Sequence, residues 1–301
     1  MLANNIIGNT EVKEYLEKIV NSNNVLHSYL FLGTEGIGKK EIAKEFAKKI
    51  LCSTKEEGCT CKSCLCFDSN NHPDLYVIDY DNQSIKIDEI RTLTEKVIEK
   101  PIISEKKVYI INNAETMTKE AQNCLLKTLE EPPEFVVIIL ISSNDNLILN
   151  TIKSRCMTIK FNNIVNELIK KYIDENLEYG ELSENLLKYI NGSIGKAIKL
   201  KDIKDKYTEI ENYLKKVTSL DIVDFLYYGK VIYDKENIND ILNYIIVCLY
   251  SNSKDNVNYI YAIEHVNKCS LRLKANSNFD LCIDNMLMGI WEEMNENSYR
   301  S

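Results

Sequence analysis

The sequence predicts an α/β domain in the first half of the chain and an all-helical remainder. Two observations lead to this division. Up to about residue 162, near-continuous apolar runs of strand length alternate with amphipathic stretches of helical period. That alternation is typical of a parallel sheet covered by helices on both faces. Beyond residue 162 the strand pattern disappears. A chain of 301 residues is long enough for about two domains, each with its own core.

Four apolar runs are the expected strands of the first domain. They are HSYLFLG (27–33), DLYVIDY (74–80), KVYIINN (107–113) and FVVIILISS (135–143). The helices expected between them are KKEIAKEFAKKIL (39–51), KIDEIRTLTEKVIEK (86–100) and TKEAQNCLLKTLEE (118–131). The pair Pro132 and Pro133 ends the last of these helices. Strands and helices in alternation predict a three-layer α/β domain with a parallel sheet.

The remainder is expected to be helical throughout, with no internal repeat and no long linker. Short helices are expected over 166–178, 183–192 and 195–205, and further helices over 208–220, 238–252 and 278–294. The last segment carries a broad apolar face formed by Leu281, Ile283, Met286, Leu287, Ile290 and Trp291. Such a face is either ordinary core or an oligomer interface, and the sequence leaves both open.

The sequence predicts a cytoplasmic protein. No apolar run approaches the roughly 20 residues that a membrane span needs, and the start of the chain has no pattern of a secretory signal. Ten cysteines in such a chain indicate reduced thiols and metal binding rather than disulfides. The net charge of −8 argues against a protein that coats nucleic acid through bulk electrostatics.

The stretch GTEGIGKK (33–40) has the spacing of a phosphate-binding loop, G-x-x-x-x-G-K. It follows an expected strand and opens an expected helix, so Gly33, Gly36, Gly38 and Lys39 are the candidate phosphate-binding residues. The alternative is a glycine-rich turn that holds no ligand. Lys40 stands where serine or threonine would bind magnesium, and an ammonium group cannot be a ligand for that ion.

The second magnesium anchor of such enzymes is an acid at the end of another strand. The corresponding run, VYIINN, ends in Asn112 and Asn113, which carry no charge and cannot act as a base. Two separate strands therefore lack the groups that a metal-dependent ATPase needs. The loop could still bind ADP or phosphate weakly without magnesium, so the nucleotide is not assigned as a cofactor.

Several motifs in order give the sequence a family resemblance. HSYLFLGTEGIGKKEIA, NHPDL, KVYIINNAETMTKEAQNCLLKTLEEPPE and NTIKSRC resemble the δ′-subunit family of the bacterial DNA polymerase III clamp loader, within the AAA+ superfamily. They resemble more distantly the motor subunits of that machine and the subunits of eukaryotic replication factor C. LLKTLEEPP and SRC are the most specific. The resemblance implies an AAA+ domain over 1–162, a helical lid over 163–204 and an all-α collar, used in oligomerisation, over 205–301.

The resemblance also implies a role in DNA replication. Such a subunit joins a five-membered hetero-oligomeric ring, with motor (τ/γ) and δ subunits as partners, that loads a sliding clamp on primer–template DNA as part of the DNA-directed DNA polymerase III holoenzyme. Each active site borrows an arginine from its neighbour. Here the corresponding motif is Ser154-Arg155-Cys156. A guanidinium near the γ-phosphate is worth roughly 10³–10⁵ in rate in comparable enzymes. Taken alone, Arg155 would be interpreted as a solvated surface residue.

A third departure lies in the expected lid. Motor subunits carry a sensing arginine in a motif similar to G-S-x-R-x-A, and here GSIGKA (192–197) has Gly195 at that position. With Lys40 and the two asparagines, this predicts a stator subunit without ATPase activity of its own. An active ATPase of the same superfamily and a zinc-binding adaptor outside replication are the alternatives. Glu130 and Glu131, adjacent on a helix, are expected to be helix-end charges rather than a catalytic pair.

The segment LCSTKEEGCTCKSCLC (51–66) holds half of the cysteines. Related proteins carry a zinc module here, and the resemblance implies a structural Zn²⁺ bound by Cys52, Cys59, Cys61 and Cys64. The spacing departs from the family pattern, and Cys66 is an alternative to Cys59. Free thiols or a redox pair are the other interpretation. His72 is either a further zinc ligand or a residue that shapes the turn before the second strand.

Overall fold

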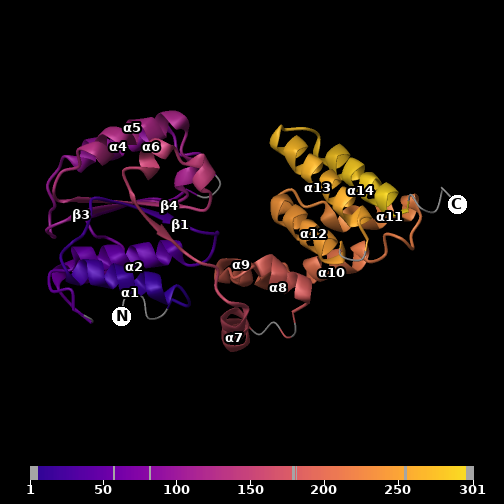
Figure 1. Cartoon of the computed structure of the whole chain (residues 1–301), viewed down its shortest axis with the longest axis horizontal. Helices are drawn as coiled ribbons and strands as arrows, with labels where there is room; N and C mark the ends of the chain where they lie inside the picture. Colours follow the sequence, from indigo (N-terminus) through magenta and orange to yellow (C-terminus); the bar gives the residue numbers. More distant parts are fainter. Residues whose placement is uncertain are drawn as a thin grey trace. The chain divides into compact units, whose positions relative to one another are not determined.

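The computed structural model describes residues 6–56, 58–80, 83–177, 180, 182–253 and 256–295, with the backbone alone for Asp202. The chain forms two compact units (Figure 1). Unit 1 comprises the chain up to Ile169 together with Gly192–Gly195, and unit 2 comprises Lys170–Asn191 and the chain from Lys196 onward. None of the helices described is both long enough and apolar enough to cross a bilayer.

Unit 1 is built on a five-stranded sheet in the order β2-β3-β4-β1-β5, in which all neighbouring strands are parallel. Its strands are β1 (Ser28–Leu32), β2 (Leu75–Ile78), β3 (Lys107–Ile111), β4 (Val136–Ser142) and β5 (Met157–Lys160). The four predicted strands are confirmed. The edge strand β5 was not predicted, because only one of its four side chains is buried and it forms no apolar run.

Helices cover both faces of this sheet (Figure 1). On one face lie α1 (Thr10–Asn21) and α2 (Lys39–Leu51), and on the other α4 (Ile87–Val97), α5 (Lys119–Glu130) and α6 (Asn150–Lys153). Alternate side chains of β4 enter the two cores: Val137 and Ile139 pack with α1 and α2, whereas Ile138 and Leu140 pack with α4 and α5. The predicted three-layer α/β domain is confirmed. The short helix α3 (Lys62–Asp68) and the 3-10 turns η1 (Ala114–Thr116) and η2 (Asp145–Leu147) complete this unit.

The remainder is helical, as predicted. Its elements are α7 (Asn166–Asn176), α8 (Glu184–Ile190), α9 (Ile194–Lys199), η3 (Leu200–Asp202), α10 (Lys204–Leu214), α11 (Ile222–Tyr228), η4 (Gly229–Ile232), α12 (Ile238–Asn252), α13 (Asn258–Lys274) and α14 (Phe279–Asn295). In α14, Ile283, Met286, Leu287 and Ile290 are buried, so most of its apolar face is core. Leu281 is an exception, since 61% of it is exposed.

A buried polar and aromatic cluster joins α8, α10 and α12 within unit 2. The rings of Tyr207 and Tyr244 stack with centroids 4.6 Å apart, and Tyr189 meets both rings edge-on. Glu211 accepts hydrogen bonds from the Tyr244 hydroxyl at 2.9 Å and from the Ser183 hydroxyl at 2.8 Å. Burial raises the pKa of Glu211, but hydrogen bonds from Lys215, Ser183 and Tyr244 outweigh burial and lower it. The cluster therefore keeps a buried carboxylate charged.

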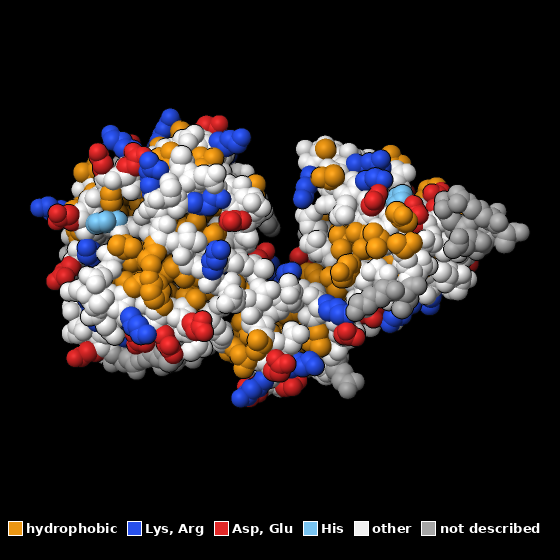
Figure 2. Space-filling model, viewed as in Figure 1, with side chains coloured by type: hydrophobic (Ala, Val, Ile, Leu, Met, Phe, Trp, Pro, Cys, Tyr) orange, Lys and Arg blue, Asp and Glu red, His pale blue; other side chains and the backbone are white. Residues whose placement is uncertain are grey.

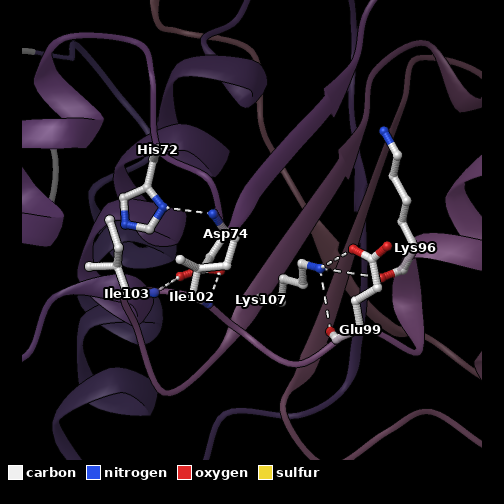
Figure 3. A network of polar contacts seen from close by, with 7 residues as sticks. All are labelled: His72, Asp74, Lys96, Glu99, Ile102, Ile103 and Lys107. Atoms are coloured by element: carbon white, nitrogen blue, oxygen red, sulfur yellow. Dashed lines mark hydrogen bonds and ion pairs between the residues drawn. The ribbon is translucent and has the colours of Figure 1, made fainter.

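A second buried network fastens the start of β2 to the loop before β3 (Figure 3). Asp74, which is 1% exposed, accepts hydrogen bonds from three successive backbone N–H groups, those of Ile102, Ile103 and Ser104, at 2.6, 2.8 and 2.9 Å. Nearby, the Lys107 ammonium donates to the carbonyl of Lys96, in the last turn of α4, and to that of Glu99, just beyond the helix. These contacts give the irregular 98–106 segment partners for its backbone groups.

His72 completes the network. Its Nδ1 accepts a hydrogen bond from the N–H of Asp74 at 3.0 Å. The Ser63 hydroxyl donates to the carbonyl of Leu51, so at 2.8 Å it accepts a hydrogen bond from Nε2 of His72. Burial lowers the pKa of His72, with the charge of Asp74 acting in the opposite direction, which agrees with a neutral ring. The interpretation of His72 as the residue that shapes the turn before the second strand is confirmed.

We expect Asp74→Ala to lower the free energy of unfolding by about 3 kcal/mol, because three partly buried N–H groups lose a buried acceptor, at the lower end of about 1–3 kcal/mol each. Urea unfolding measures this change. Asp88→Ala is the control, since Asp88 is exposed and forms its ion pair with Arg91 one turn along the same helix, and its effect should stay below about 0.5 kcal/mol. Equal effects of the two substitutions would contradict the role given to Asp74.

Candidate functional site

The glycine-rich loop runs from the end of β1 to the start of α2, which is the context of a phosphate-binding loop. Gly36 has φ 76°, in the region that favours glycine. A Cβ atom on Gly36 would lie 2.3 Å from Oγ of Ser193 and 3.1 Å from Cα of Gly195. The loop is therefore packed directly against the 192–195 segment, and no side chain fits between them.

Lys39 turns back onto its own loop. Its ammonium group donates to the carbonyl oxygens of Gly33 at 2.6 Å and Thr34 at 2.7 Å, and the residue is only 6% exposed. Burial lowers the pKa of Lys39 to about 8, although the charges of Glu115 and Glu35 act in the opposite direction. The lysine that would bind a phosphate is engaged with carbonyl oxygens of the loop itself.

Gly195, the position of the missing sensor arginine, is also in contact with this loop. Its N–H donates to the carbonyl of Gly36 at 2.9 Å, and a Cβ atom on Gly195 would lie 2.8 Å from Cα of Gly36. Real Cβ atoms essentially never come so close to another heavy atom. Any side chain at position 195, arginine included, therefore requires this contact to open.

The place expected for magnesium contains an internal cation. The ammonium group of Lys40 forms an ion pair with Asp79, the residue that follows β2. Nδ2 of Asn112, which follows β3, donates to the other oxygen of Asp79 at 2.7 Å. Burial raises the pKa of Asp79, but the hydrogen bonds from Lys40 and Asn112 outweigh burial and lower it. Asp79 is thus a charged carboxylate whose counter-ion is supplied by the chain.

Two carboxylates of this pocket were missed at the sequence level. Asp79 lies near the end of the predicted strand 74–80 and directly follows the observed strand β2, and that position was the signal that could have revealed it. Glu115 lies in the turn after β3, where its Oε1 accepts from the N–H of Ser143 at 2.9 Å and from the Ser143 hydroxyl. Its other oxygen is buried with no partner in the described part of the chain. Asn113 adopts φ 51° in the same turn, a conformation that asparagine tolerates.

Arg155 lies at the opposite edge of the sheet from the loop. Its carbonyl accepts a hydrogen bond from the hydroxyl of Ser28, the first residue of β1, whereas the phosphate loop follows the last residue of β1. The two are separated by a strand of five residues, roughly 16 Å at the usual rise. Its guanidinium contacts Glu130, the carbonyl of Thr151 and the hydroxyl of Ser154. The structure does not bring Arg155 to the loop of its own chain.

Four cysteines come together at the end of α2 and the start of α3. The sulfur atoms of Cys52, Cys59, Cys61 and Cys64 all lie within 4.8 Å of one another. Sulfurs around a tetrahedral Zn²⁺ with bonds of about 2.3 Å lie roughly 3.8 Å apart, so small movements suffice to bind the ion. Cys66, on the same short helix, lies outside this group.

Local hydrogen bonds lower the pKa of Cys52 and Cys61, whereas burial and the neighbouring thiols raise the pKa of Cys64. The N–H of Lys55 donates to the sulfur of Cys52 at 3.2 Å, and the N–H of Cys61 donates to the sulfur of Cys59 at 3.4 Å. A hydrogen bond from Ser53 is the main cause that lowers the pKa of Cys61, to about 5. The donor set fits Zn²⁺, and four thiolates leave no open position for water, so the metal would be structural.

Comparison with known proteins agrees with this geometry. The family model described as "DNA polymerase III, delta subunit" matches residues 8–165, more than half of the chain. The chain belongs to this family. The family resemblance inferred from the motifs is thereby confirmed, and the parallel sheet with helices on both faces is the three-layer α/β fold that was expected.

The delta-subunit family membership is supported by individual relatives. The chain is 35% identical over 194 residues to DNA polymerase III subunit δ′ of Bacillus subtilis, covering 63% of this chain and 58% of that protein. It is 36% identical over 136 residues to subunit δ′ of Pseudomonas aeruginosa, covering 44% of this chain and 42% of that protein. Subunit τ of Bacillus subtilis is 33% identical over 252 residues, covering 79% of this chain and 44% of that protein. The matches thus span less than two thirds of each relative.

The fold has a counterpart among solved structures. A DNA polymerase III γ-subunit-related protein from Thermotoga maritima matches with a TM-score of 0.55 and covers 93% of this chain and 99% of that protein. The sequence identity is 21%, so this likeness concerns the fold alone.

For the cysteine group we expect about one zinc per chain by elemental analysis of the purified protein. Cys64→Ser should lose the metal, because it removes one of four converging sulfurs. Cys66→Ser is the matched control and should retain it. Zinc retained in Cys64→Ser, or lost only in Cys66→Ser, would contradict this ligand set.

For the internal cation we expect Lys40→Met to lower the free energy of unfolding at pH 7 by up to about 1 kcal/mol, since the pair is partly exposed. The folded-state pKa of Asp79 is lowered, so the stabilisation is fully present above its ordinary value of 3.8 and is lost as the pH falls through the folded value. The difference between the two proteins should therefore be constant from about pH 5 to 7 and narrow below about pH 4. Urea unfolding at several pH values tests this, with the exposed Lys18→Met as control. A gap that widens on acidification would refute the assignment.

Proposed function

We propose that the protein is a δ′-type subunit of the DNA polymerase III clamp loader, which acts in the cytoplasm as a stator without ATPase activity of its own. Its partners are then the τ/γ motor subunits and the δ subunit, and it reaches the sliding clamp and primer–template DNA through the assembly. Family membership and the δ′ relatives support this assignment. A zinc-binding adaptor outside replication is disfavoured by the same membership.

The observation that carries the proposal is the state of the phosphate loop. Lys39 is bound to carbonyl oxygens of the loop, the N–H of Gly195 is bound to Gly36, and Lys40 neutralises Asp79. Phosphate binding needs the loop to release these groups, and magnesium binding needs Lys40 to leave. Nucleotide binding must first break these internal contacts, so the free energy of binding is less favourable than for a loop whose groups are free.

The position of Arg155 supports donation to a neighbour. In this chain the guanidinium and the phosphate loop lie at opposite edges of the sheet, so Arg155 cannot serve its own pocket. The side chain is 35% exposed, which makes it accessible to a partner. Arg155, placed by Ser154, is therefore proposed as the residue that contacts the γ-phosphate in the adjacent motor subunit.

The remaining regions take the roles that the resemblance implies. Residues 1–162 are proposed as the AAA+ domain with a zinc module at 52–66, residues 163–204 as the lid and residues 205–301 as the collar that joins the ring. On the face of the molecule seen in Figure 2, lysine and arginine side chains alternate with aspartate and glutamate. That face offers no continuous basic surface, which agrees with contacts to DNA that are local or shared with other subunits.

An active motor subunit is the second candidate. Relatives that are γ/τ subunits match at similar identity, for example 35% over 171 residues in Mycoplasma pneumoniae, and Asp79 and Glu115 supply carboxylates at the pocket. This candidate requires Lys40 and Lys39 to exchange their present partners for metal and phosphate. Turnover of ATP by the isolated chain distinguishes the two candidates.

The test of the proposal is reconstitution with τ/γ, δ, clamp and primed DNA. The isolated chain should hydrolyse ATP at background rate. Arg155→Ala should leave assembly intact and remove the ATPase of the site it faces, which should fall by about 10³-fold or more. Arg91→Ala is the control, because Arg91 is also exposed but pairs with Asp88 on its own helix. Rapid turnover by the isolated chain, or full ATPase in the ring with Arg155→Ala, would overturn the proposal.

A further inference from the structure

Glu130 is brought into contact with Arg155 by the fold. It is the last residue of α5 and lies two positions before Pro132. Its Oε1 lies 2.6 Å from Nη2 of Arg155, although the two residues are 25 positions apart in the sequence. The neighbouring Glu131 is exposed and forms no ion pair with the described residues, so the contact distinguishes one glutamate of the pair from the other.

The guanidinium of Arg155 contacts three groups of the chain. Nη2 contacts Glu130, and Nη1 donates to the carbonyl of Thr151 at 2.9 Å and to the hydroxyl of Ser154 at 3.1 Å. A guanidinium has five N–H donors in a fixed plane. Within the described chain these contacts use both donors of Nη1 and one of Nη2, so Nε–H and the second Nη2–H remain available to an acceptor from outside.

The backbone of Arg155 is fixed as well. Its N–H donates to the carbonyl of Ile152 at 3.0 Å, and its carbonyl accepts from the hydroxyl of Ser28 at 2.7 Å. The next residue, Cys156, is buried in the core between the sheet and α5. The backbone of Arg155 is thus fixed, and only its long side chain remains to be ordered.

We infer that Glu130 is a positioning residue for Arg155, which rests on the proposed donation of Arg155 to a neighbour. Ordering a long arginine side chain costs conformational entropy, and a side chain already held in its working geometry avoids that cost when the subunits meet. Glu130 does not act by charging the guanidinium, because arginine is protonated at any relevant pH. It acts by holding the planar group in one orientation, in which its two remaining donors are left for an acceptor of the neighbouring subunit.

The exposure of the pair argues for geometry over stability. The side chain of Glu130 is 48% exposed and that of Arg155 is 35% exposed. Ion pairs this accessible contribute little to folding. The ion pair with Glu130 therefore does little for folding, but together with the contacts to Thr151 and Ser154 it fixes the direction of the Arg155 side chain. That direction matters at the phosphate of a neighbouring subunit.

Glu130→Gln in the reconstituted ring tests the inference. The relevant quantity is the part of the ATPase that Arg155→Ala removes. We expect Glu130→Gln to lower the kcat of this part on the order of tenfold through misplacement of the guanidinium, with KM for ATP and ring assembly unchanged. Glu131→Gln, which makes the same change of charge one residue away, should have no effect. Glu130→Asp should recover part of the loss.

The double substitution distinguishes positioning from any separate role of Glu130. If Glu130 acts through Arg155, adding Glu130→Gln to Arg155→Ala causes no further loss. The inference is overturned by additive losses, by an unchanged or raised ATPase in Glu130→Gln, or by an equal loss in Glu131→Gln. If Arg155→Ala itself leaves the ATPase unchanged, the proposed function fails and the inference fails with it, whereas failure of Glu130→Gln alone leaves the proposed function intact.

Discussion

The direction of the parallel strands is the constraint on which the rest of the structure depends. Helices cover both faces of the sheet, as is usual for parallel strands. Because all five strands run in the same direction, their carboxyl ends meet at one edge of the sheet. That edge brings together the loop after β1, Asp79 after β2, Asn112 after β3 and Ser143 after β4. Arg155 precedes β5 and must lie at the other edge. A single topological feature therefore builds the pocket and separates it from the arginine.

The polar groups around the glycine-rich loop have partners within the chain. Buried polar groups need partners, and a phosphate loop exposes several N–H groups while its lysine carries a charge. Here carbonyl oxygens of the loop satisfy Lys39, and Asp79 satisfies Lys40. The close approach of Gly36 and Gly195 depends on the absence of side chains at both positions. The glycine at 195 is thus required by packing and is more than a missing arginine.

What the sequence could predict follows from the range of the interactions concerned. Long buried strands and amphipathic helices have patterns that can be recognised in a short stretch of sequence. The structure accordingly contains the four predicted strands and the helices between them. The edge strand β5 has one buried side chain in four residues and leaves no such pattern. The contact of Glu130 with Arg155 joins the end of one helix to the residue after another, so it exists only through tertiary packing. Which of Cys59 and Cys66 approaches the other thiols is likewise decided by the path of the chain between α2 and α3.

In the cysteine group, contacts that are local in the sequence combine with contacts made only through tertiary packing. Leu51, whose carbonyl accepts from Ser63 and Ser104, directly precedes Cys52, and Ser63 directly precedes Cys64. Hydrogen bonds to the carbonyl of Leu51 and to His72 therefore fix the residue that precedes each of two of the four cysteines without any metal. The other two are carried by the intervening segment, so binding a metal closes only that short loop. Because the entropy of closure grows with loop length, a module anchored in this way demands less of the ion than four independent thiols would. Irregular spacing of the cysteines is then compatible with a tetrahedral site, since the anchors and the loop, rather than the count of residues between thiols, decide where the sulfurs meet.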